Sequence, residues 1–358
     1  MIGNHAVPVI VDAYLKGNRK FDVERAYNAI KTTLTTDHYK AFFEDYDKYG
    51  YLPYDLHKNE SVSMTLENTF DDYCAAILAK ELGKMDDYEF FNKRANYWKN
   101  LFDQQTLLMR GKDSQGKWRE PFDGFGYTDD GVANGADYTE GNAWHYSWHV
   151  LQDIPGLIDM FGGNEKLCQQ LDILFRTNLT QERGLKHPRD VTGLIGEYAH
   201  GNEPCHHVAY LYRLAGQPHK TEALVNEICT NLYKTGVEGL CGNEDCGAMS
   251  AWYIFSCLGF YPVNPCGGEY VFGAPQVEKA TIHLPGGKTF TVRAENYSEK
   301  NCYVDKIELN GKEISADSIQ HSDIMNGGEL VFHMTYSEEI DVKPYILAGG
   351  VNHSINKD

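Results

Sequence analysis

Helical patterns recur in pairs along the chain up to about Cys257, and this recurrence limits the folds that the chain can adopt. Apolar residues repeat at the spacing of one helix face, for example at Phe91, Ala95, Trp98 and Phe102. The predicted helices cover residues 4–16 and 21–35, 64–82 and 87–103, 141–160 and 164–177, 205–214 and 219–234, and a last segment that ends near Cys257. Since no residue-level repeat accompanies them, we predict a mainly α fold in which helix hairpins form a ring or a stack.

The alternation of inner and outer helices in such a ring predicts where a pocket forms. If every second helix is an inner one, all inner helices begin on the same rim. Polar residues stand at the predicted starts of five inner helices: Asn4-His5, Glu67, Glu140, Glu203 and Asp245. Long aromatic loops fall on this rim too, and helix N-termini there attract anionic groups. We therefore expect the binding pocket at this rim.

The pattern changes to short strands after residue 267. Two strands flank Pro285-Gly286-Gly287 and read as a hairpin, and a third ends before Asn310-Gly311. The predicted strands are 281–284, 290–294, 303–309 and 329–335. We therefore divide the chain into a helical catalytic domain, residues 1–267, and a small C-terminal β module, residues 268–358, to which we assign a packing role.

Composition excludes several classes of partner. The 33 basic and 51 acidic side chains give a net charge of −18, which repels nucleic acid and anionic membrane surfaces. No apolar run is long enough to span a bilayer. The 9 cysteines are scattered without a C-x-x-C pair, so neither a disulfide framework nor a zinc site is predicted. The 24 tyrosines fit a ligand that stacks on aromatic rings, such as carbohydrate, although packing alone also uses such rings.

The segment from Tyr138 to Trp148 combines one acid, Glu140, with four aromatic rings. Aromatic faces stack on sugars, and a carboxyl group near apolar rings can keep its proton near neutral pH. On a helix, Glu140, Trp144 and Trp148 would share one face. The alternative is structural: Asp137 caps the helix and Glu140 reaches back as the second half of a capping box.

Two further segments place an acid beside glycines at a predicted helix start, residues 200–207 with Glu203 and residues 242–252 with Asp245. Each acid alone reads as a helix cap, and Pro204 suits the first helical position. Three such acids on one rim, next to glycines that let a ligand approach the backbone, favour a shared site.

If these segments bind a metal ion, their residue types fit calcium better than zinc. The pattern His200-x-x-Glu203-x-x-His206 lacks the histidine spacing of H-E-x-x-H, and Pro204 interrupts the helix. His145 and His149 have the i, i+4 spacing of that motif. We nevertheless expect their side chains to pack or form hydrogen bonds and not to bind a metal. Oxygen atoms of Asn202 and Glu203 suit a hard cation such as Ca²⁺.

The chain resembles the calcium-dependent exo-α-mannosidases of glycoside hydrolase family 92. The resemblance rests on the segments 140–144 (EGNAW), 201–204 (GNEP), 242–247 (GNEDCG), 61–67 (SVSMTLE), 209–212 (AYLY), 215–218 (AGQP) and 258–265 (LGFYPVNP). It implies an (α/α)6 catalytic domain preceded by an N-terminal β-sandwich. Family members are about twice as long, so the resemblance implies that the sandwich and the first helices of the toroid are missing, and that the chain could associate with the missing half. It also suggests a periplasmic or secreted location, although the first residues have no leader pattern.

The resemblance also implies a reaction and roles for particular residues. Terminal α-linked mannose would be released from glycans with inversion, Glu140 acting as general acid and Asp245 as the base that activates water. Such a pair needs carboxyl groups roughly 6.5–9.5 Å apart. A calcium ion, with Glu203 and Asn202 as candidate ligands, would bind the 2- and 3-hydroxyls of mannose. Expected substrate-binding residues are Trp144, Glu244, His200 and Asn243, and α-1,2 is the expected linkage.

Two other functions stay open at this point. The chain could be a truncated mannose-binding remnant that has lost turnover. It could also be another (α/α)6 enzyme, such as a polysaccharide lyase, but the charge of −18 disfavours a cleft for uronates.

Overall fold

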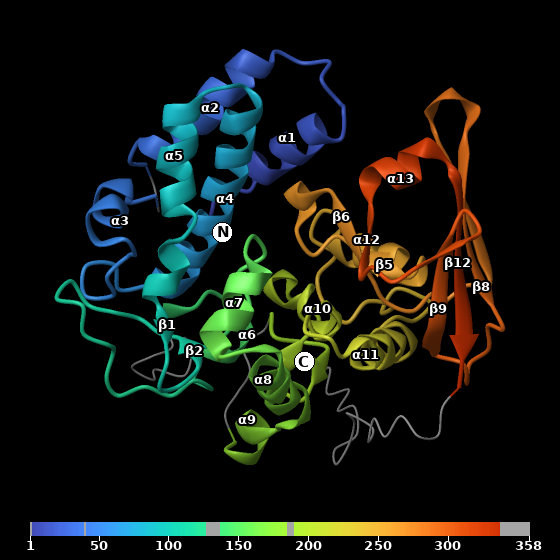
Figure 1. Cartoon of the computed structure of the whole chain (residues 1–358). Helices are drawn as coiled ribbons and strands as arrows, with labels where there is room; N and C mark the ends of the chain where they lie inside the picture. The colour runs from blue at the N-terminus through green and yellow to red at the C-terminus, as the bar shows by residue number, and fades with distance from the viewer. Residues whose placement is uncertain (1, 39–40, 127–136, 185–189, 337–358) are drawn as a thin grey trace.

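The computed structural model describes residues 2–38, 41–126, 137–184 and 190–336. Helix pairs occupy one side of the molecule and a β region the other (Figure 1). The N-terminal helices are α1 (Ala6–Leu15), α2 (Val23–Thr35), α3 (Phe43–Tyr49), α4 (Ser61–Glu81) and α5 (Met85–Arg94), followed by the 3-10 helix η1 (Tyr97–Asn100). The predicted pair 4–16 with 21–35 and the predicted helix 64–82 are thereby confirmed, whereas the predicted helix 87–103 ends at Arg94 and gives way to η1 and a short strand.

Helix α4 is the centre of this first lobe. It has 21 residues, and nearly all of them are buried because α1, α2 and α5 pack around it. Arg94 neutralises Asp72 inside this packing at 3.0 Å. The helix begins earlier than predicted, so the placement of Glu67 at a helix start is wrong. Glu67 lies inside α4, where His149 and His5 contact its carboxylate at 3.0 and 2.8 Å.

The predicted helix 141–160 is two separate helices. These are α6 (Ala143–Tyr146) and α7 (Ile154–Phe161). The break follows from local chemistry: the Asp153 carboxylate accepts a hydrogen bond from Gly156 N, and Pro155 stands in the first turn, so a new helix starts there. Trp148 therefore lies beyond α6, and the predicted face of Glu140, Trp144 and Trp148 on one helix is wrong.

The remaining helices follow the predicted order, with 3-10 turns where one longer helix was expected. They are α8 (Asn164–Arg176), α9 (Leu179–Glu182), η4 (Glu203–Cys205), η5 (Val208–Tyr210), α10 (Leu211–Leu214), α11 (Pro218–Asn231) and α12 (Ala248–Cys257). Two short hairpins lie among them, β1 (Phe102–Asp103) with β2 (Leu108–Met109) and β3 (Leu194–Ile195) with β4 (Tyr198–Ala199). In the described parts of the chain, no helix is both long and apolar enough to cross a membrane.

The C-terminal region is built from two sheets, and the four predicted strands all belong to the larger one. The five-stranded sheet has the order β10-β9-β12-β8-β7 and the three-stranded sheet β11-β6-β5. The strands are β5 (Phe260–Tyr261), β6 (Glu269–Phe272), β7 (Lys279–His283), β8 (Thr289–Glu295), β9 (Tyr303–Leu309), β10 (Lys312–Ile314), β11 (Ser318–Gln320) and β12 (Gly328–Thr335). The short helices η6 (Pro265–Gly267), η7 (Pro285–Gly287) and α13 (His321–Asn326) join them.

The fold class is as predicted: mainly α, with helix pairs of the (α/α)6 type followed by a small β module. The core of this module contains Phe272 and Phe332, whose rings meet edge to face at 5.6 Å. Strand β5 pairs with β6 across position 267. The division into domains 1–267 and 268–358 stays a prediction, and residues 337–358 lie outside the described part.

Candidate active site

Glu140 stands just before α6, but it is not part of a capping box. The helix cap is Asn142, whose side chain accepts a hydrogen bond from His145 N at 3.2 Å. Asp137 is buried and forms an ion pair with Arg119 instead. The Glu140 side chain is exposed and its backbone is left-handed, with φ of 48°. The chain thus presents this carboxyl group at the surface of the rim in a conformation that non-glycine residues rarely adopt.

The same backbone conformation recurs at two other rim acids. Glu60 precedes α4 with φ of 62°, and Asp245 precedes α12 with φ of 39°. Glu60 is linked to the Glu140 segment, because the Thr139 hydroxyl donates a hydrogen bond to Glu60 Oε1 at 3.0 Å. Sequence reasoning missed Glu60, since the helical pattern appeared to begin after it.

The loop before η4 also contacts the segment that carries Glu140, through Asn202. The Asn202 side-chain amide donates a hydrogen bond to the Glu140 backbone carbonyl at 2.9 Å. Asn202 is itself almost fully buried, at 7% exposure. A ring nitrogen of His145 contacts the Glu197 carbonyl at 2.9 Å and fixes the base of the same junction. Two of the three predicted acidic segments are therefore in direct contact.

Gly201 and Gly242 allow the third segment, residues 242–252, to pack closely against the loop that carries Glu203. A Cβ on Gly242 would collide with the backbone of Gly201, and a Cβ on Gly201 would collide with the Thr192 hydroxyl. Gly201 N also donates a hydrogen bond to the Thr192 carbonyl at 3.0 Å. These glycines are needed because three loops pack backbone against backbone, so the expectation that both of them make room for a ligand is wrong.

Negative charge accumulates where the segments meet. Although the Glu140 side chain is exposed, partial desolvation raises its pKa, and the carboxylates of Asp190, Asp245 and Glu60 raise it further. Desolvation also raises the pKa of Glu203, and Asp245 and Glu140 add to that effect. A carboxyl group in such surroundings holds its proton more tightly, which suits a general acid.

Glu203 has the property expected of a cation ligand. Its Oε1 atom is buried and meets no hydrogen-bond donor among the described residues, and its carboxyl group lies next to that of Asp245. A buried carboxylate oxygen is costly unless a donor or a cation contacts it. Across the described ranges, no group of three or more His, Cys, Asp or Glu side chains is arranged to hold a metal by itself. A cation here would therefore also need oxygen from Asn202, from backbone carbonyls or from a ligand, which is the ligand chemistry of calcium.

Trp144 lies inside the wall of the site. It is 7% exposed and stacks on Phe125, with ring centroids 5.4 Å apart. Its indole Nε1 is buried and has no acceptor among the described residues. Since a buried indole N–H ordinarily finds a partner, this donor is a candidate contact for a polar ligand.

His200 lies behind the rim. Its side chain has 0% exposure, and its ring nitrogens lie 2.7 Å from the Tyr198 hydroxyl and 2.8 Å from the Tyr233 hydroxyl. Burial lowers its pKa strongly, so the ring is neutral. In this arrangement the His200 side chain supports the loop from inside the protein.

Asn243 and Glu244 are on the loop that carries Asp245. The Asn243 amide lies 3.4 Å from Asp190 Oδ1, and Asp190 is the strongest single charge acting on Glu140. Glu244 accepts hydrogen bonds from Ser250 N and Ser250 Oγ at 3.0 and 2.8 Å. Glu244 thus secures the start of α12, while Asn243 contacts Asp190, an acid that no sequence motif indicated.

A protein family and several solved structures match most of this chain. The glycosyl hydrolase family 92 catalytic domain matches residues 1–336. The family GH92 α-mannosidase BT3965 of Bacteroides thetaiotaomicron, solved with mannoimidazole, superposes with a TM-score of 0.87 at 42% identity; the match covers 94% of this chain and 44% of that one. The inverting mannosidase BT2199 of the same species gives a TM-score of 0.83 at 36% identity, covering 94% and 46%.

A sequence match to a further protein also indicates a glycosidase. An uncharacterized secreted glycosidase of Arthroderma benhamiae is 28% identical, over 97% of this chain and 47% of its own length. The chain therefore spans less than half the length of the relatives that it matches. Since the family's catalytic domain matches nearly the whole chain, this protein belongs to glycosyl hydrolase family 92.

Proposed function

We propose that this chain carries the catalytic centre of an inverting exo-α-mannosidase that releases terminal α-linked mannose from glycans. The observation that supports this most is the meeting of Glu140, Asp245 and Glu203 at one rim, with Asn202 bonded to the Glu140 backbone. An inverting glycosidase needs one protonated and one ionised carboxyl group on opposite sides of a sugar. The solved relatives are described as α-mannosidases, which supports mannose as the sugar.

Glu140 is the proposed general acid. Its raised pKa favours the protonated form, which donates its proton to the glycosidic oxygen as the bond from that oxygen to C1 breaks. Asp245 is the proposed base: it accepts a proton from a water molecule whose oxygen forms the new bond to C1 on the opposite face. The products are mannose with inverted configuration and the shortened glycan.

Glu203 and Asn202 are the proposed holders of a calcium ion. Bound calcium supplies a fixed positive centre for sugar hydroxyls. The unpartnered, buried Oε1 of Glu203 fits this role, since a cation would offset the cost of its desolvation. Asn202 joins the two parts of the site, because its amide nitrogen already binds the Glu140 carbonyl.

Trp144, Asn243 and Glu244 are the proposed residues around the bound sugar. The indole N–H of Trp144 is available to a sugar hydroxyl, and Asn243 and Glu244 border Asp245. His200 acts from behind, through the loop that it supports. An α-1,2 linkage remains the proposed preference, and association with the sandwich-containing half of the family polypeptide is proposed as well.

Hydrolysis of α-mannobiosides with Glu140→Gln and Asp245→Asn variants tests the proposal. Each change is expected to lower kcat by roughly 10²–10⁴-fold, the usual contribution of general acid or base catalysis. Glu313→Gln, an exposed acid on β10, is the matched control and should keep full activity. A calcium chelator should also reduce turnover. Hydrolysis that needs no calcium and persists in both active-site variants would contradict the proposal. Mannose binding without hydrolysis would favour the alternative that the chain is a mannose-binding remnant without turnover.

A further inference from the structure

The residue before the proposed acid, Thr139, is bound at two points by the start of α4. Its backbone N–H donates a hydrogen bond to Ser63 Oγ at 2.9 Å, and its hydroxyl donates one to Glu60 Oε1 at 3.0 Å. The Tyr146 hydroxyl is hydrogen-bonded to both Ser63 and Thr139 and closes the group. Ser63 has 0% exposure and Thr139 has 7%, so water does not compete freely for these bonds.

The contacts continue along α4 on both flanks of the acid. Before it, the Ser61 hydroxyl donates a hydrogen bond to Asp137 Oδ1 at 3.0 Å. After it, His149 Nε2 lies 3.0 Å from Glu67 Oε2. Since α4 is buried along nearly its whole length, it gives the segment 137–149 a rigid support.

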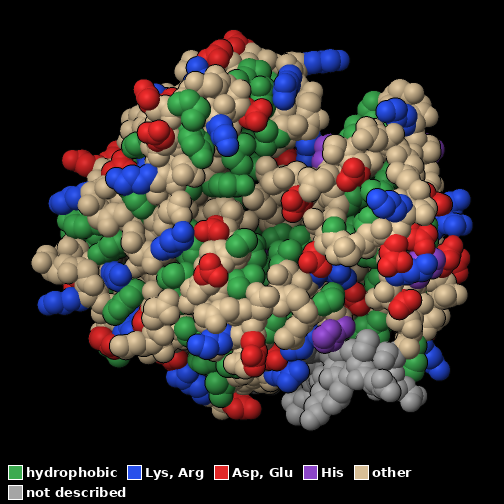
Figure 2. Space-filling model, in the orientation of Figure 1, with side chains coloured by type: hydrophobic (Ala, Val, Ile, Leu, Met, Phe, Trp, Pro, Cys, Tyr) green, Lys and Arg blue, Asp and Glu red, His purple; other side chains and the backbone are tan. Residues whose placement is uncertain are grey.

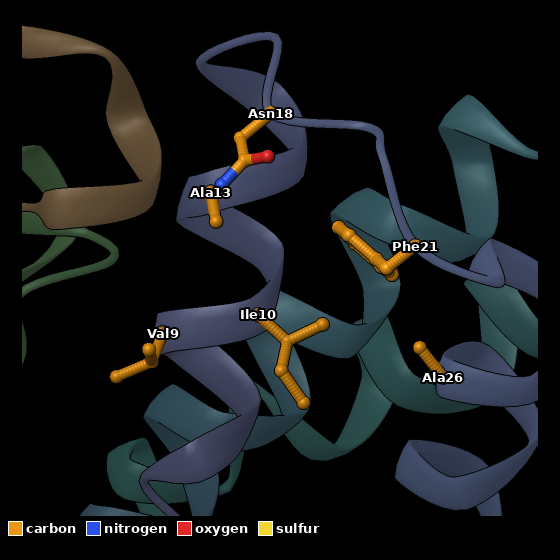
Figure 3. A pocket seen from close by; sticks show the side chains of 6 residues that line it. All are labelled: Val9, Ile10, Ala13, Asn18, Phe21 and Ala26. Atoms are coloured by element: carbon orange, nitrogen blue, oxygen red, sulfur yellow. The ribbon is translucent and has the colours of Figure 1, made fainter.

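The surface of the same lobe is different in character. Apolar side chains reach it in several places (Figure 2). A shallow hollow of about 300 Å³ beside α1 is lined mainly by such side chains (Figure 3): Val9, Ile10, Ala13, Asn18, Phe21 and Ala26. The hydroxyls of Ser63 and Thr139 are buried instead, so they bind other parts of the protein and not the solvent.

Glu140 is held on its other side by Asn202, whose amide donates to the Glu140 carbonyl at 2.9 Å. The chain is therefore fixed at the N–H of Thr139 and at the carbonyl of Glu140, on both sides of a left-handed backbone with φ of 48°. A strained conformation of this kind persists only where the surrounding structure determines it. The bonds from α4 and from Asn202 together provide that constraint.

We propose that Ser63 and Glu60 are positioning residues for Glu140, which form with Asn202 a clamp that keeps the Glu140 carboxyl group aimed at the glycosidic oxygen. This rests on the proposed function, in which Glu140 is the general acid. Ser63 and Glu60 act on the acid through Thr139. Because the proton passes to the leaving oxygen over a hydrogen-bond distance, a small displacement of the carboxyl group slows that step.

The dependence of the rate on the leaving group separates positioning from general damage. The sugar leaving group of an α-mannobioside needs protonation, whereas the phenolate of dinitrophenyl α-mannoside departs without it. Ser63→Ala should lower kcat for the mannobioside roughly tenfold and change kcat for the aryl mannoside by less than about twofold. KM should stay the same for both substrates. Glu140→Gln, measured beside it, should show the same selectivity with a larger loss.

Glu60 allows a conservative comparison. Glu60→Gln keeps a side-chain oxygen that accepts the hydrogen bond of the Thr139 hydroxyl, whereas Glu60→Ala removes it. The alanine variant should lower kcat for the mannobioside roughly tenfold, and the glutamine variant should keep most of the activity. Glu313→Gln, at an exposed position on β10, controls for the loss of a negative charge.

A stability cycle tests the clamp without turnover. If Ser63 and Asn202 restrain the same strained residue, the loss of one bond lets the segment relax and weakens the effect of losing the other. Ser63→Ala and Asn202→Ala combined should therefore lower the thermal midpoint of the full chain by less than the sum of their separate effects. Thr221→Val is the matched control, because it removes a different buried hydroxyl that accepts from a backbone N–H, that of Arg213 at 3.0 Å. Its effect should add to that of Asn202→Ala, and it should alter kcat for the two substrates equally.

Three results would overturn the inference: equal losses on both substrates in Ser63→Ala, equal rates for the two Glu60 variants, or midpoint changes of Ser63→Ala and Asn202→Ala that simply add. A different result would count against the proposed function instead. If Glu140→Gln slowed both substrates equally, or the wild type hydrolysed neither, Glu140 would not be shown to act as the acid, and the stability cycle alone would decide whether the clamp exists.

Discussion

The side chain of Asn202 donates a hydrogen bond to the backbone carbonyl of Glu140 at 2.9 Å, joining two segments that are far apart in sequence. This contact holds an acid whose left-handed backbone, with φ of 48°, is intrinsically unfavourable. The position of the Glu140 carboxyl group therefore depends on a loop that also carries Glu203.

Replacement of Asn202 tests this dependence. Asn202→Ala should lower kcat for α-mannoside hydrolysis by roughly 5- to 150-fold, the equivalent of losing about 1–3 kcal/mol from a buried hydrogen bond. Asn92→Ala, at an exposed position on α5, is the control and should leave kcat unchanged. Equal rates for the two variants would show that the contact does not position Glu140.

Gly242 should tolerate no side chain. Its Cβ would collide with the Gly201 backbone, so Gly242→Ala must push apart the loops that carry Glu203 and Asp245. We expect lower activity together with a lower thermal midpoint. Gly267→Ala is the matched control, since its Cβ would approach only the Asn264 side chain, at 3.3 Å. If Gly242→Ala unfolds at the same temperature as the wild type with full activity, the packing account of this glycine fails.

Calcium should stabilise the folded chain through Glu203. A ligand that binds only the folded state raises the thermal midpoint. Added CaCl₂ is expected to raise the midpoint of the wild type, and Glu203→Ala should remove most of that increase, whereas Glu313→Gln should keep it. Magnesium chloride at the same concentration controls for ionic strength. An identical calcium shift in the Glu203 variant would exclude this residue as a ligand.

Glu227 gives a pH dependence of stability that is independent of the site. Desolvation by burial raises its pKa from 4.5 to about 7. The folded chain thus binds this proton more tightly than the unfolded chain, so the contribution to stability is present below pH 4.5 and is lost as the pH rises through about 7.

Glu227→Gln should therefore raise the thermal midpoint at pH 8 and change it little at pH 4. The expected gain is about 1–2 kcal/mol after allowance for partial exposure, or several degrees. Glu238→Gln, on an exposed loop, should give no gain at either pH. A gain that does not vary with pH would contradict the account.

The sequence predicted the helix pairs and the β strands because those elements have strong periodic patterns. The two N-terminal pairs, α8 and the hairpin of β7 with β8 all occur where periodicity or turn residues indicated them. The break between α6 and α7 was missed because Asp153 and Pro155 act locally, against a continuous apolar pattern.

The candidate site was only partly predictable for a related reason. Glu140, Glu203 and Asp245 stand beside glycines in recognisable motifs, so the sequence singled them out. Glu60 and Asp190 carry no such pattern, and only the folding of distant loops brings their charges near Glu140. His200 was assigned to the substrate because it lies in a motif, but its burial between two tyrosines could not be seen from spacing alone.

The central claim is that Glu140 and Asp245 act from opposite faces of an α-mannoside, and the anomer formed first tests it most directly. Proton NMR during the first minutes of hydrolysis, with the sandwich-containing half supplied if turnover requires it, distinguishes the two anomers before they equilibrate. The account predicts β-mannose as the initial product, lost in Glu140→Gln. Initial release of α-mannose would contradict it.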